Sequence, residues 1–71
     1  MPSDAAHRHI VAQIRALTRR RKWSQNQLAD FAGLSRAQVS RVLACKQSPT
    51  ITTMMRIAKA LETSLRDLMP T

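Results

Sequence analysis

The chain has 71 residues, and its 12 lysines and arginines outnumber 4 acidic residues to give a formal net charge of +8. A chain of this length forms one domain that buries about 60% of its unfolded surface and leaves little room for a catalytic cavity, while the positive charge favours a polyanionic partner. The single cysteine forms neither an internal disulfide nor a metal cluster, and no apolar stretch suits a membrane span or a signal peptide, so we expect a cytoplasmic protein.

The first predicted helix runs from about residue 4 or 5 to about residue 20. Ile10, Ile14 and Leu17 recur at the spacing i, i+4 and i+7, which gives one apolar stripe. The basic run 19–22 closes this helix, where positive charge offsets the negative end of the helix dipole. We expect at most one or two of these four side chains to reach a phosphate as well.

Two short helices follow, over residues 25–32 and 36–44. Each begins with a capping box, in which a serine oxygen accepts from a backbone N–H and a glutamine reaches back to the N–H of the serine. The two boxes pair Ser24 with Gln27 and Ser35 with Gln38. Gly33 stands where the chain leaves the first of these helices, a position that usually needs a positive φ. This pattern predicts a helix-turn-helix over residues 24–44, whose second helix can lie in the DNA major groove.

A loop over residues 46–49 is predicted next, because Pro49 disfavours a helical conformation of the residue before it. The fourth helix then begins after Thr50 as its cap. Its expected inner face consists of Ile51, Met54, Ile57, Ala58 and Leu61.

Ser64 should cap a last short helix from residue 65 to about 69, with Asp67 as its box partner and Pro70 as its end. No strand alternation or internal repeat is present in the sequence. We therefore expect an all-α protein of five helices, with residues 1–71 in one domain.

The segment WSQNQLADFAGLSRAQVSRVLACKQSPTITTMMRIAKALETSLRDL resembles the helix-turn-helix domain of phage repressors and Cro proteins, the XRE-like family. With the preceding helix, the resemblance covers about residues 8–69. It rests on linked features at fixed spacing: the Ser-Gln opening of the second helix, Leu28-Ala29, Gly33, Ser35, Val39-Ser40-Arg41, Pro49 and the run Ile57 to Leu61. The resemblance implies a five-helix bundle like that of lambda repressor.

The sequence departs from the family pattern at two kinds of position. Cys45 and Glu62 stand where the family usually has glycine, so either those turns differ or the chain tolerates strain of about 1 kcal/mol at each. Thr18 and Leu43 stand where members often have an Arg–Glu pair. Because both partners are absent together, no unpaired charge remains.

In this fold the first turn of the third helix faces base edges in the major groove. That turn carries Arg36, Ala37 and Gln38, and Arg41 follows one turn later. An arginine can pair with guanine O6 and N7, and the methyl group of Ala37 can meet a thymine methyl. Gln38 has two competing roles, as a reader of adenine and as part of a capping box. The resemblance therefore makes these four the expected base-reading residues.

Phosphate contacts are expected around the start of the second helix, where the backbone N–H of Gln25 is free at the positive end of the helix dipole. The companion phosphate contacts are Ser24, Asn26, Ser35, Ser40 and Lys46. The sequence suggests no cofactor, and His7 and His9 lack a third ligand for a metal. Cys45 is interpreted as structural, and Phe31 and Leu43 are candidates for a protein contact.

We therefore expect a sequence-specific DNA-binding regulator, most simply a repressor that binds an inverted-repeat operator as a homodimer through its C-terminal part. No effector site is evident, no membrane contact is expected, and no set of catalytic residues suggests an enzyme. The alternative is a protein-interaction module with the same fold, such as an antitoxin or a scaffold domain. The charge of the third helix distinguishes the two, because its outward residues Arg36 and Arg41 favour DNA.

Overall fold

The computed structural model describes the backbone of residues 2–69 and the side chains of residues 5–69. Five α-helices follow one another along the chain, and the described residues contain no strand. The helices are α1 (Pro2–Arg20), α2 (Gln25–Ala32), α3 (Arg36–Leu43), α4 (Ile51–Ala60) and α5 (Leu65–Leu68). The predicted all-α fold is thus confirmed, as are the bounds predicted for α2.

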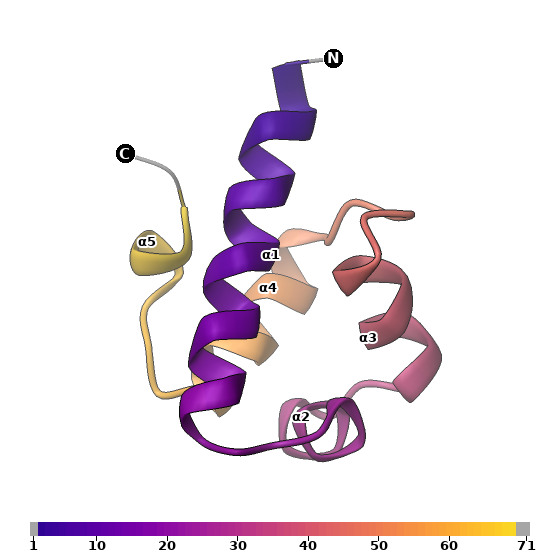
Figure 1. Ribbon diagram of the computed structural model, residues 1–71, viewed down its shortest axis with the longest axis vertical. Helices are drawn as coiled ribbons and strands as arrows, with labels where there is room; N and C mark the ends of the chain where they lie inside the picture. Colours follow the sequence, from indigo (N-terminus) through magenta and orange to yellow (C-terminus); the bar gives the residue numbers. More distant parts are fainter. Residues whose placement is uncertain (1, 70–71) are drawn as a thin grey trace.

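The long helix α1 forms one side of the bundle, with α3 packed on one flank and α5 on the other (Figure 1). Helix α2 lies across the end of the bundle near the C-terminus of α1, and it packs against both α3 and α4. The pair α2 and α3 is therefore supported from behind by α1 and α4. This support fixes the direction in which the outer face of α3 points.

Three helix ends differ from the predicted ones by small amounts. Helix α1 begins at Pro2, two or three residues early, because a proline at the first helical position has its φ already fixed and lacks an N–H that would have no partner there. Helix α3 ends at Leu43 with Ala44 as its cap, and α5 ends at Leu68. The prediction that Pro70 ends α5 lies outside the described residues.

Four of the helices end in the same turn, in which one residue has left-handed backbone geometry. After α3, for example, the N–H of Cys45 donates to the carbonyl of Val42 at 3.1 Å and that of Lys46 donates to Arg41 at 3.0 Å. The residues with positive φ are Lys22 (59°), Gly33 (70°), Cys45 (58°) and Glu62 (55°). The turns at Cys45 and Glu62 therefore keep the geometry that usually requires glycine, and Lys22 adds a third such position that the sequence did not reveal.

The core is a single cluster of buried apolar side chains from all five helices, including Ile14 of α1, Leu28 of α2, Val39 of α3 and Ile57 of α4. Two face assignments were wrong. Ile51 is 59% exposed because it is the first residue of α4, and the buried stripe of that helix begins one turn later.

Leu43 was the other wrong assignment, since it is only 5% exposed and belongs to the core. The position at which the resemblance implies a charged residue is thus part of the interior in this chain. The facing residue, Thr18, is 7% exposed, and its hydroxyl donates to the carbonyl of Ile14 at 2.6 Å. A buried polar group is thus satisfied within its own helix.

Helices α2 to α5 begin at the predicted caps, and one of the predicted capping boxes is absent. The hydroxyl of Thr50 accepts from the N–H of Thr53 at 3.1 Å, and the Ser64 hydroxyl accepts from the N–H of Asp67 at 3.2 Å. The carboxylate of Asp67 accepts from the neighbouring Thr63 hydroxyl at 3.4 Å. Ser64 therefore caps α5 as predicted, but Asp67 does not complete a capping box.

Candidate nucleic-acid interface

Both capping boxes of the helix-turn-helix are complete. At α2, Gln27 N–H donates to Ser24 Oγ at 3.2 Å, and Ser24 N–H donates to Gln27 Oε1 at 2.8 Å. At α3, the corresponding bonds between Gln38 and Ser35 are 3.1 and 3.0 Å long. Each box fixes the direction in which its helix begins, which is what a helix needs if its first turn is to meet a partner reproducibly.

The turn between α2 and α3 rests on Gly33. Its φ of 70° is a conformation that side chains disfavour, and a Cβ added there would lie 3.0 Å from a terminal nitrogen of Arg56. That arginine, from α4, donates to the Gly33 carbonyl at 3.3 Å. The turn is therefore held both by the glycine and by a side chain from behind it.

The four predicted base-reading residues all have exposed side chains on α3, and Val39 and Val42 of the same helix are buried. Helix α3 thus presents one face to the core and the opposite face to solvent. The Arg41 side chain is additionally oriented, because its Nε donates to Gln47 Oε1 at 3.2 Å. Gln47 comes from the loop after α3 and was not among the predicted residues.

The residues predicted to contact phosphates lie on the first turn of α2, on α3 and in the turn that follows α3. Five of them are exposed, namely Ser24, Asn26, Ser35, Ser40 and Lys46. Gln25 is half-buried as the first residue of α2. The first intrahelical bond of α2 is donated by the N–H of Leu28, so the earlier backbone N–H groups of Gln25 and Asn26 are free to meet an anion.

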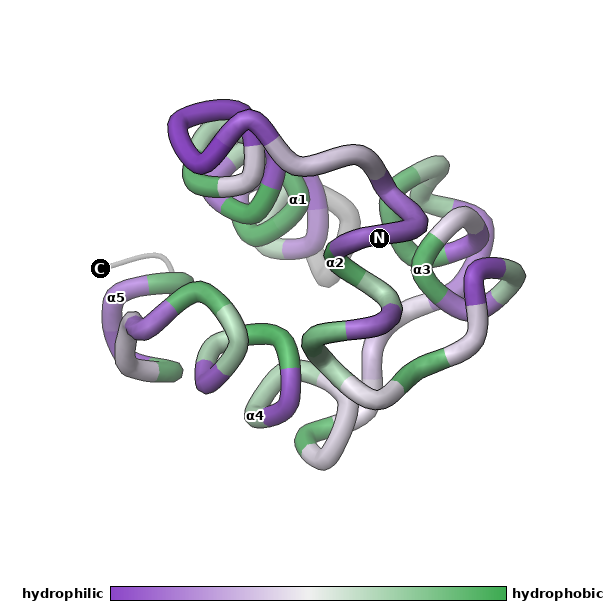
Figure 2. Tube along the Cα trace, turned by 90° about the horizontal axis from the view of Figure 1, so that it is seen from below, coloured by the Kyte–Doolittle hydropathy of each residue, from purple (hydrophilic) through white to green (hydrophobic). Residues whose placement is uncertain are grey.

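The most hydrophilic continuous stretch near these elements is the end of α1 with the turn after it, residues 19–22 (Figure 2). Within it, Arg21 donates to the carbonyl of Leu61 at 2.9 Å and approaches Glu62 at 3.7 Å. Its guanidinium also lies 5.2 Å from the ring centre of Trp23. Arg21 is therefore engaged by the end of α4.

Cys45 was interpreted as structural, and it takes part in the backbone hydrogen bonds of the turn after α3 and not in the core. Its side chain is exposed in the turn after α3, so it contributes nothing to the core. Among the side chains of residues 5–69, no three His, Cys, Asp or Glu residues come together as a metal site would require. None of the helices between residues 2 and 69 is long and apolar enough to cross a membrane.

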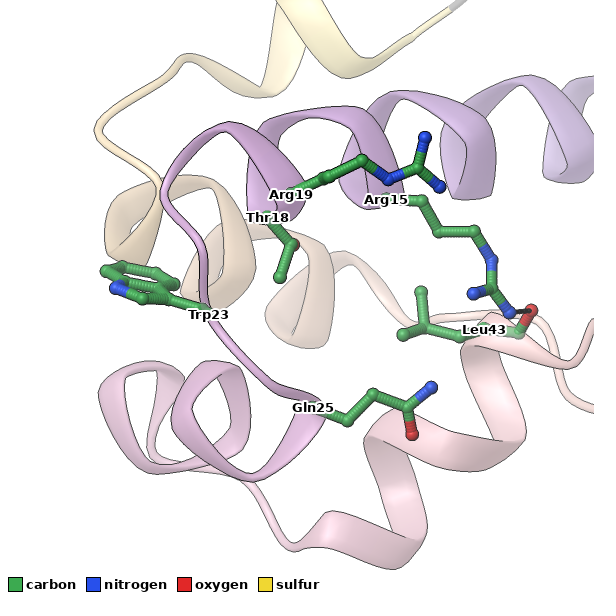
Figure 3. Close-up of a pocket in the computed structure, with 6 residues that line it drawn as sticks. All are labelled: Arg15, Thr18, Arg19, Trp23, Gln25 and Leu43. Carbon is green, nitrogen blue, oxygen red and sulfur yellow. Dashed lines mark hydrogen bonds between the residues drawn. The ribbon is translucent and has the colours of Figure 1, made fainter.

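A pocket that the sequence did not reveal lies beside these elements, between α1, the start of α2 and the end of α3 (Figure 3). Its lining residues are Arg15, Thr18, Arg19, Trp23, Gln25 and Leu43. Arg15 Nη2 donates to the Leu43 carbonyl at 3.0 Å across this pocket. No local spacing predicts this contact, because the two residues are 28 positions apart.

Residues 13–68 match the sequence model of the Helix-turn-helix family HTH_3, and the chain belongs to that family. Among curated protein sequences, none is similar enough to count as a match.

Solved structures with the same fold include three regulators. A hypothetical transcription factor, NHTF from Neisseria, is 25% identical with a TM-score of 0.86, over 92% of this chain and 75% of its own. The restriction-modification controller protein C.AhdI from Aeromonas hydrophila is 26% identical with a TM-score of 0.81, over 87% of this chain and 94% of its own. The P22 c2 repressor, solved with a synthetic operator, is 25% identical with a TM-score of 0.75, over 83% of this chain and 89% of its own. The family and these relatives support a DNA-binding regulator as the class of this chain.

Proposed function

We propose that the chain is a sequence-specific DNA-binding transcriptional regulator, in the simplest case a repressor that occludes a promoter. The outer face of α3 carries the proposal, because Arg36 and Arg41 are exposed there on a helix whose start is fixed by a complete capping box. Such a helix, supported by α2 across a glycine turn, suits insertion into the major groove. The resemblance to the P22 c2 repressor, which was solved with operator DNA, supports the same partner.

Within this proposal, each exposed residue of α3 has a chemical role. Arg36 and Arg41 read guanine through paired bonds to O6 and N7, and Ala37 offers its methyl group to thymine. Gln38 donates from its amide nitrogen, because its amide oxygen is engaged by the N–H of Ser35. The phosphate contacts come from Gln25 and its companions Ser24, Asn26, Ser35, Ser40 and Lys46.

The active species in this proposal is a homodimer that reads an inverted repeat. One domain of this size buries a modest interface with DNA, and two half-sites about one helical turn apart provide the remaining affinity and specificity. We place the contact between protomers at α5 or the loop before it, and Met69, the residue that follows α5, exposes an apolar side chain beside this region. The protein then acts in the cytoplasm of a bacterial, phage-infected or plasmid-bearing cell, with no effector assigned.

A mobility-shift assay against the promoter of its own operon tests this proposal. The wild-type chain should bind with sequence preference, and its affinity should fall with salt at a log–log slope of about −0.9 per phosphate neutralised. The double variant Arg36→Ala, Arg41→Ala should lose both affinity and preference. As a matched control, Arg8→Ala removes an exposed charge near the N-terminal end of α1 and should retain the sequence preference of DNA binding. Unchanged binding by the double variant would show that these arginines do not read the operator.

The alternative function, a protein-interaction module, is supported by a groove between α2 and α4 in which two large apolar side chains are exposed among charged ones such as Asp30 and Lys59. Phe31 is 60% exposed there and Met55 is 56% exposed, and both line the groove. The ring of Phe31 also packs on Trp23, with 4.6 Å between ring centres. A salt-independent affinity for a protein partner, with no preference among DNA sequences, would favour this function over the first.

A further inference from the structure

The face of α1 that carries Arg15 and Arg19 closes a pocket of ≈ 200 Å³ with the first residue of α2 and the last residue of α3 (Figure 3). Thr18, between the two arginines, turns inward and bonds its own helix. The polar groups that the pocket offers to a ligand are therefore mainly the two guanidinium groups of α1 and the amide of Gln25.

The Arg15 guanidinium is held in place by the protein. Its Nη2 donates to the carbonyl of Leu43 at 3.0 Å, one of the carbonyls that α3 leaves without an intrahelical partner at its C-terminus. A guanidinium has five N–H donors, so one such bond orients the group and leaves others for a ligand. Arg15 is thus anchored and still able to bind.

The charge of this pocket is not balanced within the part of the chain that the structure describes. Arg15 and Arg19 are four residues apart on one helix, a spacing at which like charges repel. No acidic residue lines the pocket, and the one described ion pair joins Arg21 to Glu62. An anion that accepts several hydrogen bonds would relieve this repulsion, and a phosphate group is the anion best matched to arginine.

We propose that Arg15 and Arg19 bind a phosphodiester of the DNA backbone at the edge of the major groove that α3 enters. The pocket lies between the start of α2 and the end of α3, the two helices to which the DNA contacts were assigned above. This inference rests on the proposed function. It adds a phosphate clamp on α1, while the base-reading residues on α3 stay as proposed.

The test measures the salt dependence of DNA affinity for single and double variants of the full chain. The double variant Arg15→Gln, Arg19→Gln should lower the steepness of the log–log plot by about 0.9, because the two arginines neutralise one phosphate, and each single variant should lower it by a part of that amount. For the double variant, the ratio of wild-type to variant affinity should shrink about threefold between roughly 50 and 200 mM salt. Sequence preference should remain, because phosphate contacts do not read bases. Arg15→Lys, which keeps the charge, should restore most of the slope. Arg8→Gln, an exposed arginine of α1 outside the pocket, should leave the slope unchanged.

Thermal unfolding of the same variants separates binding from a purely structural role of Arg15. If Arg15→Gln lowers Tm but leaves the salt slope as in the wild type, Arg15 only caps α3 and the inference is overturned. A titration with inorganic phosphate distinguishes the source of the anion. If the two variants weaken phosphate binding but leave the salt slope of DNA binding unchanged, the pocket takes a free anion and the inference also fails.

Failure of the inference is distinguishable from failure of the proposed function. The clamp alone would be overturned by two results together. The wild-type chain would bind DNA with a sequence preference that Arg36→Ala abolishes, and the pocket variants would leave the salt slope unchanged. A wild-type chain without any DNA affinity would overturn both.

Discussion

The amide oxygen of Gln38 accepts a hydrogen bond from the backbone N–H of Ser35 at 3.0 Å, while the N–H of Gln38 donates to the Ser35 hydroxyl at 3.1 Å. The sequence left Gln38 with two competing roles, and this geometry lets it perform a part of each. An adenine contact with two hydrogen bonds needs both the oxygen and the nitrogen of the amide. With its oxygen engaged, Gln38 can only donate one bond to a base while the cap remains intact.

We therefore predict that Gln38 matters more for stability than for sequence preference. Gln38→Ala removes the bond to the amide oxygen and should lower the free energy of unfolding by about 0.5–1 kcal/mol, the net contribution of one hydrogen bond at an exposed site. Gln38→Glu retains an acceptor for the N–H of Ser35 and should keep nearly the wild-type stability. Urea unfolding of the three chains measures the difference. Equal stability of the alanine and glutamate variants would mean that the cap bond contributes nothing.

The hydrogen bond between Arg41 and Gln47 leads to a second prediction. Because Gln47 Oε1 accepts from Arg41 Nε at 3.2 Å, it restricts the direction in which the guanidinium points, and in the proposed complex this direction decides which base Arg41 meets. Arg41→Ala should cost about 1–3 kcal/mol of discrimination at one operator position, and Gln47→Ala should cost less, about 0.5–1 kcal/mol, at the same position. Binding to a set of operators with single base changes locates that position.

Ser48→Ala is the control for this pair, because Ser48 is the next exposed residue of the loop and makes no described bond to Arg41. A Gln47→Ala effect spread evenly over all operator positions would contradict the orienting role. It would indicate a phosphate contact in its place.

The two isoleucines of α4 should respond very differently to substitution. Ile57 is a fully buried member of the core, so Ile57→Ala should cost about 2–5 kcal/mol, a large part of the stability of a domain this small. Ile57→Val, at about 0.5–1.5 kcal/mol, remains measurable if the alanine variant does not fold. Ile51→Ala should change stability by less than about 0.5 kcal/mol. Thermal unfolding measures these differences. A similar loss of stability in both alanine variants would contradict the assignment of Ile57 to the buried face of α4 and of Ile51 to the exposed face.

The features that the sequence predicted are those decided within a few residues. Each capping box depends on a serine and a glutamine three positions apart, and both boxes have the expected bonds. The left-handed turn at Gly33 was predicted from the glycine itself, and the same turn at Lys22, Cys45 and Glu62 shows that glycine is not required for it. The roles of the base-reading and phosphate-contacting residues remain predictions, although all of these residues except the half-buried Gln25 are exposed on or next to α2 and α3.

The features that the sequence did not predict depend on which helix ends meet in space. Three arginines donate to backbone carbonyls at or next to the ends of other helices, over separations of 28, 40 and 23 residues. The pairs are Arg15 with Leu43, Arg21 with Leu61 and Arg56 with Gly33. Net charge alone therefore overstates the number of free cations, because part of the positive charge also stabilises helix C-termini. The pocket beside Arg15 could not be predicted for the same reason.

Left-handed backbone at Cys45 provides a last prediction. A non-glycine residue at a φ of 58° is strained by about 1–2 kcal/mol, and glycine removes that strain at a cost of about 0.4–1 kcal/mol in chain entropy. Cys45→Gly should therefore raise stability by up to about 1 kcal/mol, which corresponds to a few degrees in Tm for a domain of this size. The neighbouring Ala44 has a φ of −84°, so Ala44→Gly removes no strain and should lower Tm. If both variants lowered Tm to the same extent, the turn after α3 would store no strain that glycine can relieve.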